Sequence, residues 1–290
     1  MTTHPRGNFY LKETDKEIIR WFTEYHYLQP LHVQLLSRRH IIAVRRRLRQ
    51  LHDQGFVVRT TVPFARNAPI WSPPDQYVYY LSRKGLTLAQ ELGFADDQAR
   101  YNPEKSEALL PHDLFLTTFH LTLRLATAAA GDIHLIYWEQ RRAVLQDSVR
   151  ASYERYSVNP DAVFFLKDDG KPQDQNTSYF FLEYERSRPS GHAQGESNFI
   201  RKMRGFYEYH RTAGDAKRWG IPNFYVVTVT PTRERALNLC QATQERELPF
   251  KRFWFTDASH VSVERPAEIL EKIFFTPKDY AQGVFYSLRT

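Results

Sequence analysis

Residues 38–66 read RRHIIAVRRRLRQLHDQGFVVRTTVPFAR, and the pattern of this stretch changes at Gly55. Four apolar residues before Gly55 recur every three or four positions: Ile41, Val44, Leu48 and Leu51. This spacing predicts a helix with one buried stripe, capped by Ser37 and ended by Gly55. After Gly55, residues 56–62 are rich in β-branched residues and predict a strand.

The same stretch holds the positive charge of the chain. It contains eight arginines and one acid, Asp53, which gives +7, and the whole chain of 290 residues is also +7. The rest of the chain therefore sums to zero. Guanidinium groups fit phosphates and guanine edges well, so we expect this segment to contact double-stranded DNA. The candidate contact residues are Arg38, Arg39, Arg45, Arg46, Arg49, Arg59 and Arg66.

The flanking sequence extends this helix into a domain. Two further helices are expected, over residues 14–28 and, opened by Pro30, over 30–37. A second strand is expected over 76–82. Three helices followed by two strands predict a winged helix-turn-helix over 10–95, in which Arg39, Ala43, Arg46 and Gln50 face the major groove. A basic helical dimerisation domain is the alternative, which the charge and the element order disfavour.

The remainder predicts a second domain of mixed α/β type. A polar linker is expected over 96–108, followed by an αβββαβαβ domain over 109–290. Its strands are expected over 132–139, 157–167, 178–185, 223–230 and 251–257. Helices are expected over 112–131, 197–214 and 231–244. The fold class is therefore α+β or mixed α/β, with a winged helix-turn-helix at its N-terminal end.

Three carboxylates are expected to meet in the second domain. A hairpin centred near residue 172 would place Asp161 opposite residue 184, within reach of Glu183 and Glu185, which share a strand face. Such a group repels itself unless a divalent cation or protons lie within it. Solvent-facing acids, or a salt-bridge site with neighbouring arginines, are the alternatives.

Composition excludes several classes. One cysteine, Cys240, allows no intrachain disulfide, and no signal peptide or membrane span is apparent, so a cytoplasmic protein without membrane contacts is expected. There is no GxxxxGK[ST] or GxGxxG for a nucleotide and no HExxH for zinc. No His-x-His triplet supports a relaxase.

Two motifs resemble the PD-(D/E)xK nuclease superfamily: N-P-D-A at 159–162 and F-F-L-E-Y-E at 180–185. The resemblance implies a restriction-endonuclease-like fold in which Asp161 and Glu183 hold Mg²⁺. Glu185 stands where that superfamily usually has lysine, and Lys202 on the following helix is the replacement. Asp161, Glu183, Glu185 and Lys202 are therefore the implied catalytic residues, and the departure at Glu185 leaves open whether the site cuts DNA.

Together with a His112–Asp113 pair and a Trp138–Glu139 strand end, these motifs resemble the replication-relaxation family over residues 10–275. The resemblance implies a DNA-binding protein of a plasmid, phage or integrative element, acting in replication, transfer or its regulation, with a catalytically silent nuclease-like domain. A Mg²⁺-dependent endonuclease and a winged-helix transcription regulator are the alternatives. The implied partners are double-stranded DNA, the proteins of a replication, transfer or defence complex, and a second copy of the chain.

Overall fold

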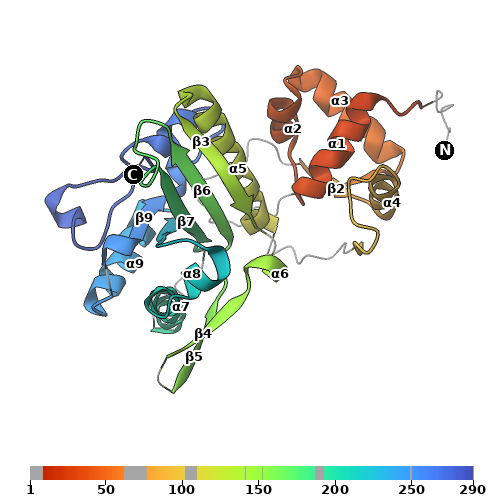
Figure 1. The fold of residues 1–290 in the computed structure, drawn as a ribbon. Coiled ribbons are helices and arrows are strands. Elements are labelled where there is room, and N and C mark those ends of the chain that lie inside the picture. Colours follow the sequence, from red (N-terminus) through yellow and green to blue (C-terminus); the bar gives the residue numbers. More distant parts are fainter. Residues whose placement is uncertain are drawn as a thin grey trace. The chain divides into compact units, whose positions relative to one another are not determined.

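The computed structural model describes residues 9–61, 77–101, 110–140, 142–151, 153–186, 193–248 and 250–289 (Figure 1). The chain is a mixture of helices and strands with a five-stranded sheet. It divides into two compact units at Thr117/Thr118, and each unit is described by itself. In the described residues, no helix is long and apolar enough to cross a membrane.

The first unit holds three helices followed by a two-stranded antiparallel hairpin and a fourth helix. Its elements are α1 (Glu13–Glu24), α2 (Pro30–Ser37), α3 (Ile41–Asp53), β1 (Val57–Thr61), β2 (Tyr77–Leu81) and α4 (Arg83–Glu91). The predicted order of three helices and two strands is confirmed. Val44, Leu48 and Leu51 are buried, as their spacing predicted.

The predicted start of the third helix is wrong. Arg38 adopts a left-handed backbone (φ 53°), which ends α2 and separates it from α3. The helix starts at Ile41, and the His40 ring caps it by accepting a hydrogen bond from the Ile42 N–H at 3.3 Å. Ser37 instead accepts a hydrogen bond from the backbone of Arg39. Arg38 and Arg39 therefore lie in the turn that precedes α3.

The second unit contains most of α5 (Leu110–Ala130) and the elements after it. These elements are β3 (Ile133–Glu139), α6 (Arg142–Leu145), β4 (Asp147–Ala151), β5 (Glu154–Val158), β6 (Ala162–Asp168), β7 (Thr177–Tyr184), α7 (Ala193–Arg211), α8 (Gly214–Trp219), β8 (Tyr225–Thr230), α9 (Arg233–Glu245) and β9 (Phe253–Asp257). Short 3₁₀ turns lie before β9 at Phe250–Arg252 and after it at Ala258–His260, Pro266–Leu270 and Tyr280–Gln282.

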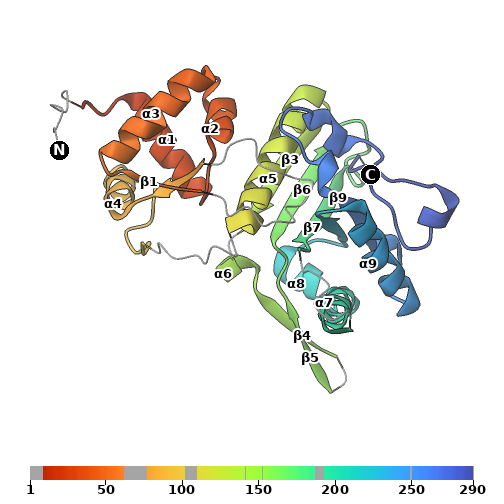
Figure 2. The same cartoon turned by 180° about the vertical axis from the view of Figure 1, so that it is seen from behind.

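The sheet has the order β3-β6-β7-β8-β9. β3, β6 and β7 are antiparallel neighbours, whereas β7, β8 and β9 run parallel. Helix α5 covers one face of the sheet, where the ring centres of Phe119 and Phe164 lie 5.8 Å apart. Helices α7 and α9 cover the other face of the sheet (Figure 2). On that face the ring centres of Phe181 and of Phe206 of α7 lie 5.9 Å apart.

A second hairpin, β4–β5, projects from the sheet beside α7 (Figures 1 and 2). The predicted single strand over 157–167 is wrong, because β5 ends at Val158 and β6 starts at Ala162. Helix α7 approaches the hairpin closely at Gly205. A Cβ there would lie 3.2 Å from the Ser157 carbonyl oxygen and 3.3 Å from Tyr156 Cβ.

Candidate functional site

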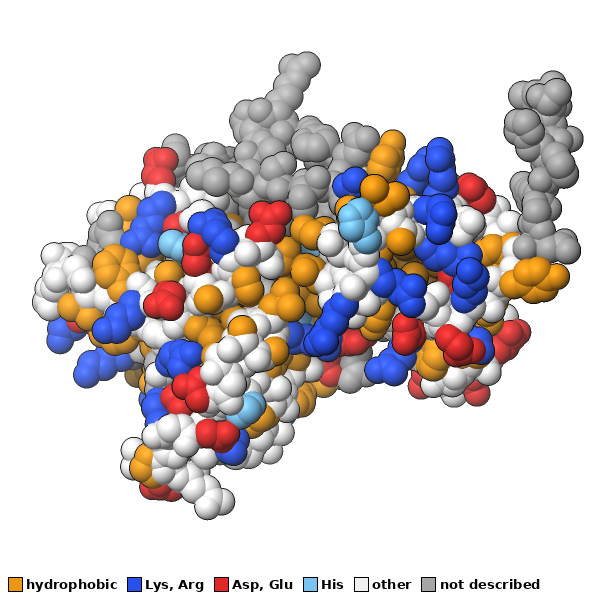
Figure 3. All heavy atoms as spheres, turned by 90° about the horizontal axis from the view of Figure 1, so that it is seen from above, with side chains coloured by type: hydrophobic (Ala, Val, Ile, Leu, Met, Phe, Trp, Pro, Cys, Tyr) orange, Lys and Arg blue, Asp and Glu red, His pale blue; other side chains and the backbone are white. Residues whose placement is uncertain are grey.

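Two groups of residues carry chemistry, one in each unit. The first is the arginine-rich surface of α3 and of the turn before it. Its arginines are exposed: Arg38, Arg39, Arg45, Arg46 and Arg49. Figure 3 shows Lys and Arg side chains gathered on the first unit. Such an accumulation favours a polyanion as the partner of this surface.

Arg47 lies in the same run but is committed to the fold. Its Nε and one terminal nitrogen each donate to an oxygen of Asp15, which is fully buried. The second oxygen of Asp15 also accepts the Lys12 backbone N–H at 2.6 Å. Arg47 further donates to the Tyr10 carbonyl at 3.0 Å. This arginine therefore ties α3 to the start of α1.

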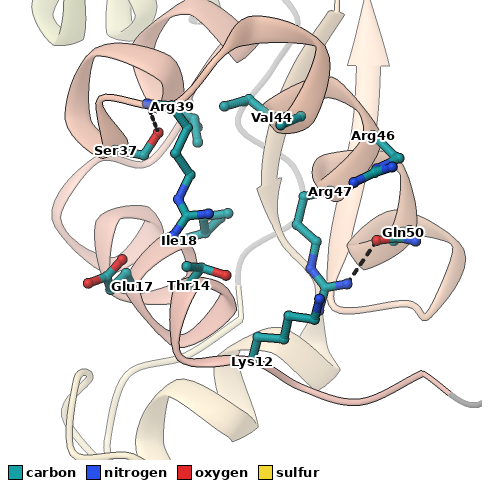
Figure 4. A pocket seen from close by; sticks show the side chains of 12 residues that line it. Lys12, Thr14, Glu17, Ile18, Ser37, Arg39, Val44, Arg46, Arg47 and Gln50 are labelled. Carbon is teal, nitrogen blue, oxygen red and sulfur yellow. Dashed lines mark hydrogen bonds between the residues drawn. The ribbon is translucent and has the colours of Figure 1, made fainter.

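A hollow of about 190 Å³ runs between α1, α2 and α3 (Figure 4). The four residues predicted to face a DNA groove line it: Arg39, Ala43, Arg46 and Gln50. Thr14 of α1 and Lys12, which directly precedes this helix, line the opposite side. In Figure 4 the Arg39 side chain runs toward Ile18 and Thr14. The residues predicted to face a DNA groove thus lie along one side of α3, and this side is turned toward α1.

The face of α3 directly opposite its buried stripe carries a residue that the sequence analysis did not select. At 100° per residue, Ile42, Arg46 and Arg49 point away from the stripe of Val44, Leu48 and Leu51. Ile42 is 67% exposed, which is high for an isoleucine in a helix. Its position in the middle of an arginine-rich face is the signal that could have identified it.

The remaining predicted contact residues belong to the β1–β2 hairpin. Arg59 is exposed on β1, with its guanidinium 4.7 Å from the centre of the Tyr77 ring. Arg66 lies outside the described residues.

The second group lies where β6 and β7 meet in the other unit. The predicted hairpin is confirmed, with Ala162 paired to Leu182, so Asp161 directly precedes the first pair. This register differs by one residue from the expected pairing of Asp161 with residue 184. The Asp161 carboxylate still reaches that residue, because its Oδ2 accepts the Tyr184 backbone N–H at 2.7 Å.

Glu183 and Lys202 form an ion pair beside Asp161. The Lys202 ammonium of α7 donates to Glu183 Oε2, and Glu183 is 3% exposed. The other oxygen, Glu183 Oε1, is buried without a hydrogen-bond partner in the described residues. Thr228 of β8 is paired with Glu183, and its buried hydroxyl also has no hydrogen-bond partner in the described residues. Buried polar atoms usually have a hydrogen-bond partner, so a water molecule or a cation is the partner expected for these two.

Burial and the neighbouring charges together set the pKa values of Glu183 and Lys202. Burial raises the pKa of Glu183 to about 8, opposed by the charge of Lys202 and assisted by the charges of Asp161 and Glu185. Burial disfavours the Lys202 ammonium, but the charges of Glu183, Asp161 and Glu185 raise its pKa above the ordinary value. Lys202 is therefore held as a cation, whereas Glu183 takes up a proton as the pH falls through about 8.

Glu185 follows β7 and lies near enough for its charge to raise the pKa of both Glu183 and Lys202. The structure thus brings all four implied residues into one neighbourhood. Within the described ranges, no three Asp, Glu, His or Cys side chains form a ready-made metal-binding group. A cation here would rely on Asp161 and Glu183 together with backbone or water oxygens.

A further acid was not included among the predicted site residues. Glu139 ends β3, is buried, and is paired with Val163, which faces α7. Directly opposed residues on neighbouring strands share a face, so Glu139 lies on the same face and at the same end of the sheet as the carboxylate group. The Trp138–Glu139 motif at the strand end was its signal in the sequence.

The fold thus defines an α+β protein with a basic helical unit and a sheet unit that carries a carboxylate–lysine site. The family model described as replication-relaxation matches residues 22–223. Because this match covers more than half of the chain, the chain belongs to the replication-relaxation family. No curated protein and no solved structure matches it.

Proposed function

We propose that the chain is a DNA-binding protein of a mobile genetic element that acts in replication, transfer or its regulation. The first unit serves as a winged helix that binds double-stranded DNA, and β1–β2 is its wing. The exposed arginines of α3 and of the turn before it carry this proposal, because Arg45, Arg46 and Arg49 occupy three positions on one short helix.

The outer face of α3 has the composition of a groove-reading surface. Arg46 and Arg49 can donate to guanine edges or phosphates, and Ile42 between them can contact a thymine methyl group. Arg38 and Arg39, in the turn before α3, are placed for phosphates that border the groove. Arg59 extends the same positive charge onto the wing.

A mobility-shift titration with short duplexes tests this assignment. We expect Arg46→Gln with Arg49→Gln to weaken binding at least ~10-fold and to lower the slope of log affinity against log salt by about 2. Arg20→Gln with Arg100→Gln is the matched control, since it removes the same charge from exposed positions in the first unit. Equal affinities of the two variants would refute the assignment of α3.

The unsatisfied Glu183 Oε1 favours a second candidate, a Mg²⁺-dependent DNA endonuclease. Asp161 and Glu183 would hold the ion, which would activate a water molecule and stabilise charge on the phosphate. Lys202 stays protonated, so it can orient the water or donate to a phosphate oxygen but cannot accept the proton of the water. The proton acceptor on this chain would then be Glu185.

Incubation of supercoiled plasmid with Mg²⁺, Mn²⁺ or EDTA separates the two candidates. Metal-dependent cutting that disappears in Asp161→Ala and in Glu183→Ala would establish the nuclease. Binding without cutting in the wild type would leave a DNA-binding protein with a silent nuclease-like unit. In that case a metal-dependent rise in melting temperature, absent in Asp161→Ala, would still assign the cation site.

A further inference from the structure

The β4–β5 hairpin separates its residues into two unlike faces. The pairing Val149–Tyr156 turns both side chains toward α7, where they are buried in the core of the second unit. The alternate pairs point outward: Ser148 faces Ser157, and Arg150 faces Arg155. We call these four residues the outer face of the hairpin.

The outer face carries two like charges in direct opposition. Arg150 and Arg155 are both exposed and occupy paired positions, an arrangement that destabilises a two-stranded ladder. Arg155 is fixed toward β4, because its Nε and a terminal nitrogen both donate to Ser148 Oγ, at 3.1 and 2.8 Å. Arg155 is thus held on the side of the hairpin to which Arg150 also belongs.

The acids of the hairpin do not neutralise them. Asp147 lies on the inward face, where its carboxylate accepts the Tyr209 hydroxyl at 2.8 Å and forms an ion pair with Arg218 at 3.2 Å. Glu154 is hydrogen-bonded to Tyr156 on the same inward side. The outer face therefore keeps a charge of +2.

Neighbouring helices continue this charge on both sides of the hairpin. On the β4 side, Lys217 of α8 and Arg150 line one hollow of about 420 Å³, together with the ion pair of Asp147 and Arg218. On the β5 side, Arg201 of α7 donates to the Arg155 carbonyl at 3.5 Å. Lys217, Arg150, Arg155 and Arg201 thus form a cationic strip that crosses the hairpin.

We infer that this strip is a second DNA-binding surface, which holds the phosphate backbone of a duplex against the outer face of the hairpin. The inference rests on the proposed DNA-binding function. Arginine and serine side chains are typical phosphate donors, and β-ribbons bind DNA in several protein classes. A phosphate between Arg150 and Arg155 would also remove their repulsion.

The strip lies next to the carboxylate–lysine site. Arg201 and Lys202 are consecutive residues of α7, and they reach the hairpin and Glu183, respectively. A duplex held by the strip would therefore pass the part of the second unit in which the carboxylates lie.

Fluorescence titrations of a labelled duplex with the full chain test the strip. We expect Arg150→Gln with Arg155→Gln to weaken binding by about 10-fold and to lower the salt slope by about 2. The control, Arg246→Gln with Lys272→Gln, removes the same charge from exposed positions elsewhere in the second unit. Its affinity is expected to match the wild type.

Melting temperature provides a readout that a structural role would change. The hairpin variant is expected to melt no lower than the wild type, since the substitution removes a repulsive pair. Affinity equal to that of the control variant would overturn the strip while leaving the α3 assignment in place. Weakening by the hairpin variant but not by the α3 variant would support the strip and overturn α3 as the reading helix.

Discussion

The two units each contain a buried carboxylate paired with a cation, and the two pairs differ in how completely the carboxylate is satisfied. Both oxygens of Asp15 are bound by Arg47, and one also accepts a backbone N–H. Glu183 has one oxygen bound by Lys202 and one without a partner in the described residues. We call the first pair saturated, because both carboxylate oxygens are hydrogen-bonded, and the second unsaturated, because one carboxylate oxygen has no partner in the described residues.

The difference follows from the two cations. Guanidinium presents several donors in a planar fork that matches both carboxylate oxygens, whereas ammonium is a point charge that here meets a single oxygen. The surroundings also differ, because Asp161 and Glu185 add negative charge around Glu183. The second pair is therefore poised to accept a cation or a proton.

The largest expected effect comes from breaking the saturated pair. Arg47→Ala would leave Asp15 buried without its partner, and such losses cost about 3 kcal/mol or more. Thermal unfolding should show a clear drop in the stability of the first unit. Arg46→Ala, one residue away and exposed, is the control and should be nearly neutral. A loss below about 1 kcal/mol for Arg47→Ala would contradict the structural role of the pair.

The second effect depends on pH. The pKa of Glu183 is raised to about 8 in the folded chain, against about 4.3 when unfolded, so the folded state binds this proton more tightly. The stabilisation is fully present below pH ~4.3 and is lost as pH rises through about 8.

Glu183→Gln should remove this dependence. Measured without divalent ions, the free energy of unfolding of the wild type should fall by at least ~2 kcal/mol more between pH 5 and 9 than that of Glu183→Gln. Parallel pH profiles for the two proteins would show that Glu183 is ionised throughout, as expected of a satisfied carboxylate.

The smallest effect comes from removing the cation of the unsaturated pair. Lys202→Met keeps the length of the side chain and should cost only about 1 kcal/mol near pH 6, because Glu183, with its pKa raised to about 8, is already largely protonated at that pH. The same change removes one positive charge, so Mn²⁺ should raise the melting temperature at lower concentrations than in the wild type. A loss in the free energy of unfolding as large as that of Arg47→Ala would show that the two ion pairs contribute equally to stability.

Local patterns predicted much of the fold. The apolar spacing of Val44, Leu48 and Leu51 identified α3, and the turn-rich segment between Lys167 and Ser178 identified the β6–β7 hairpin. That hairpin was sufficient to bring Asp161 toward Glu183. The order of the three N-terminal helices and the two following strands was also readable, because each segment is bounded by its own turn residues.

Non-local interactions were not readable. Arg47 and Asp15 are 32 positions apart, and nothing in the arginine run distinguishes Arg47 from its neighbours. The β4–β5 hairpin escaped prediction because its alternation is short and mixes serine and arginine with few apolar residues. The burial of Glu183 Oε1 depends on the packing of α7 and β8 around it, which no sequence pattern encodes.

Gly205 gives the second unit an adjustable dimension. Glycine within a helix costs about 1 kcal/mol relative to alanine, and here that cost accompanies the contact of α7 with Ser157 and Tyr156. The distance between the hairpin and the helix that carries Lys202 is therefore set by a missing methyl group. Larger side chains at this position would act as spacers, moving Arg155 of the hairpin away from Lys202 of α7 while leaving every charge unchanged.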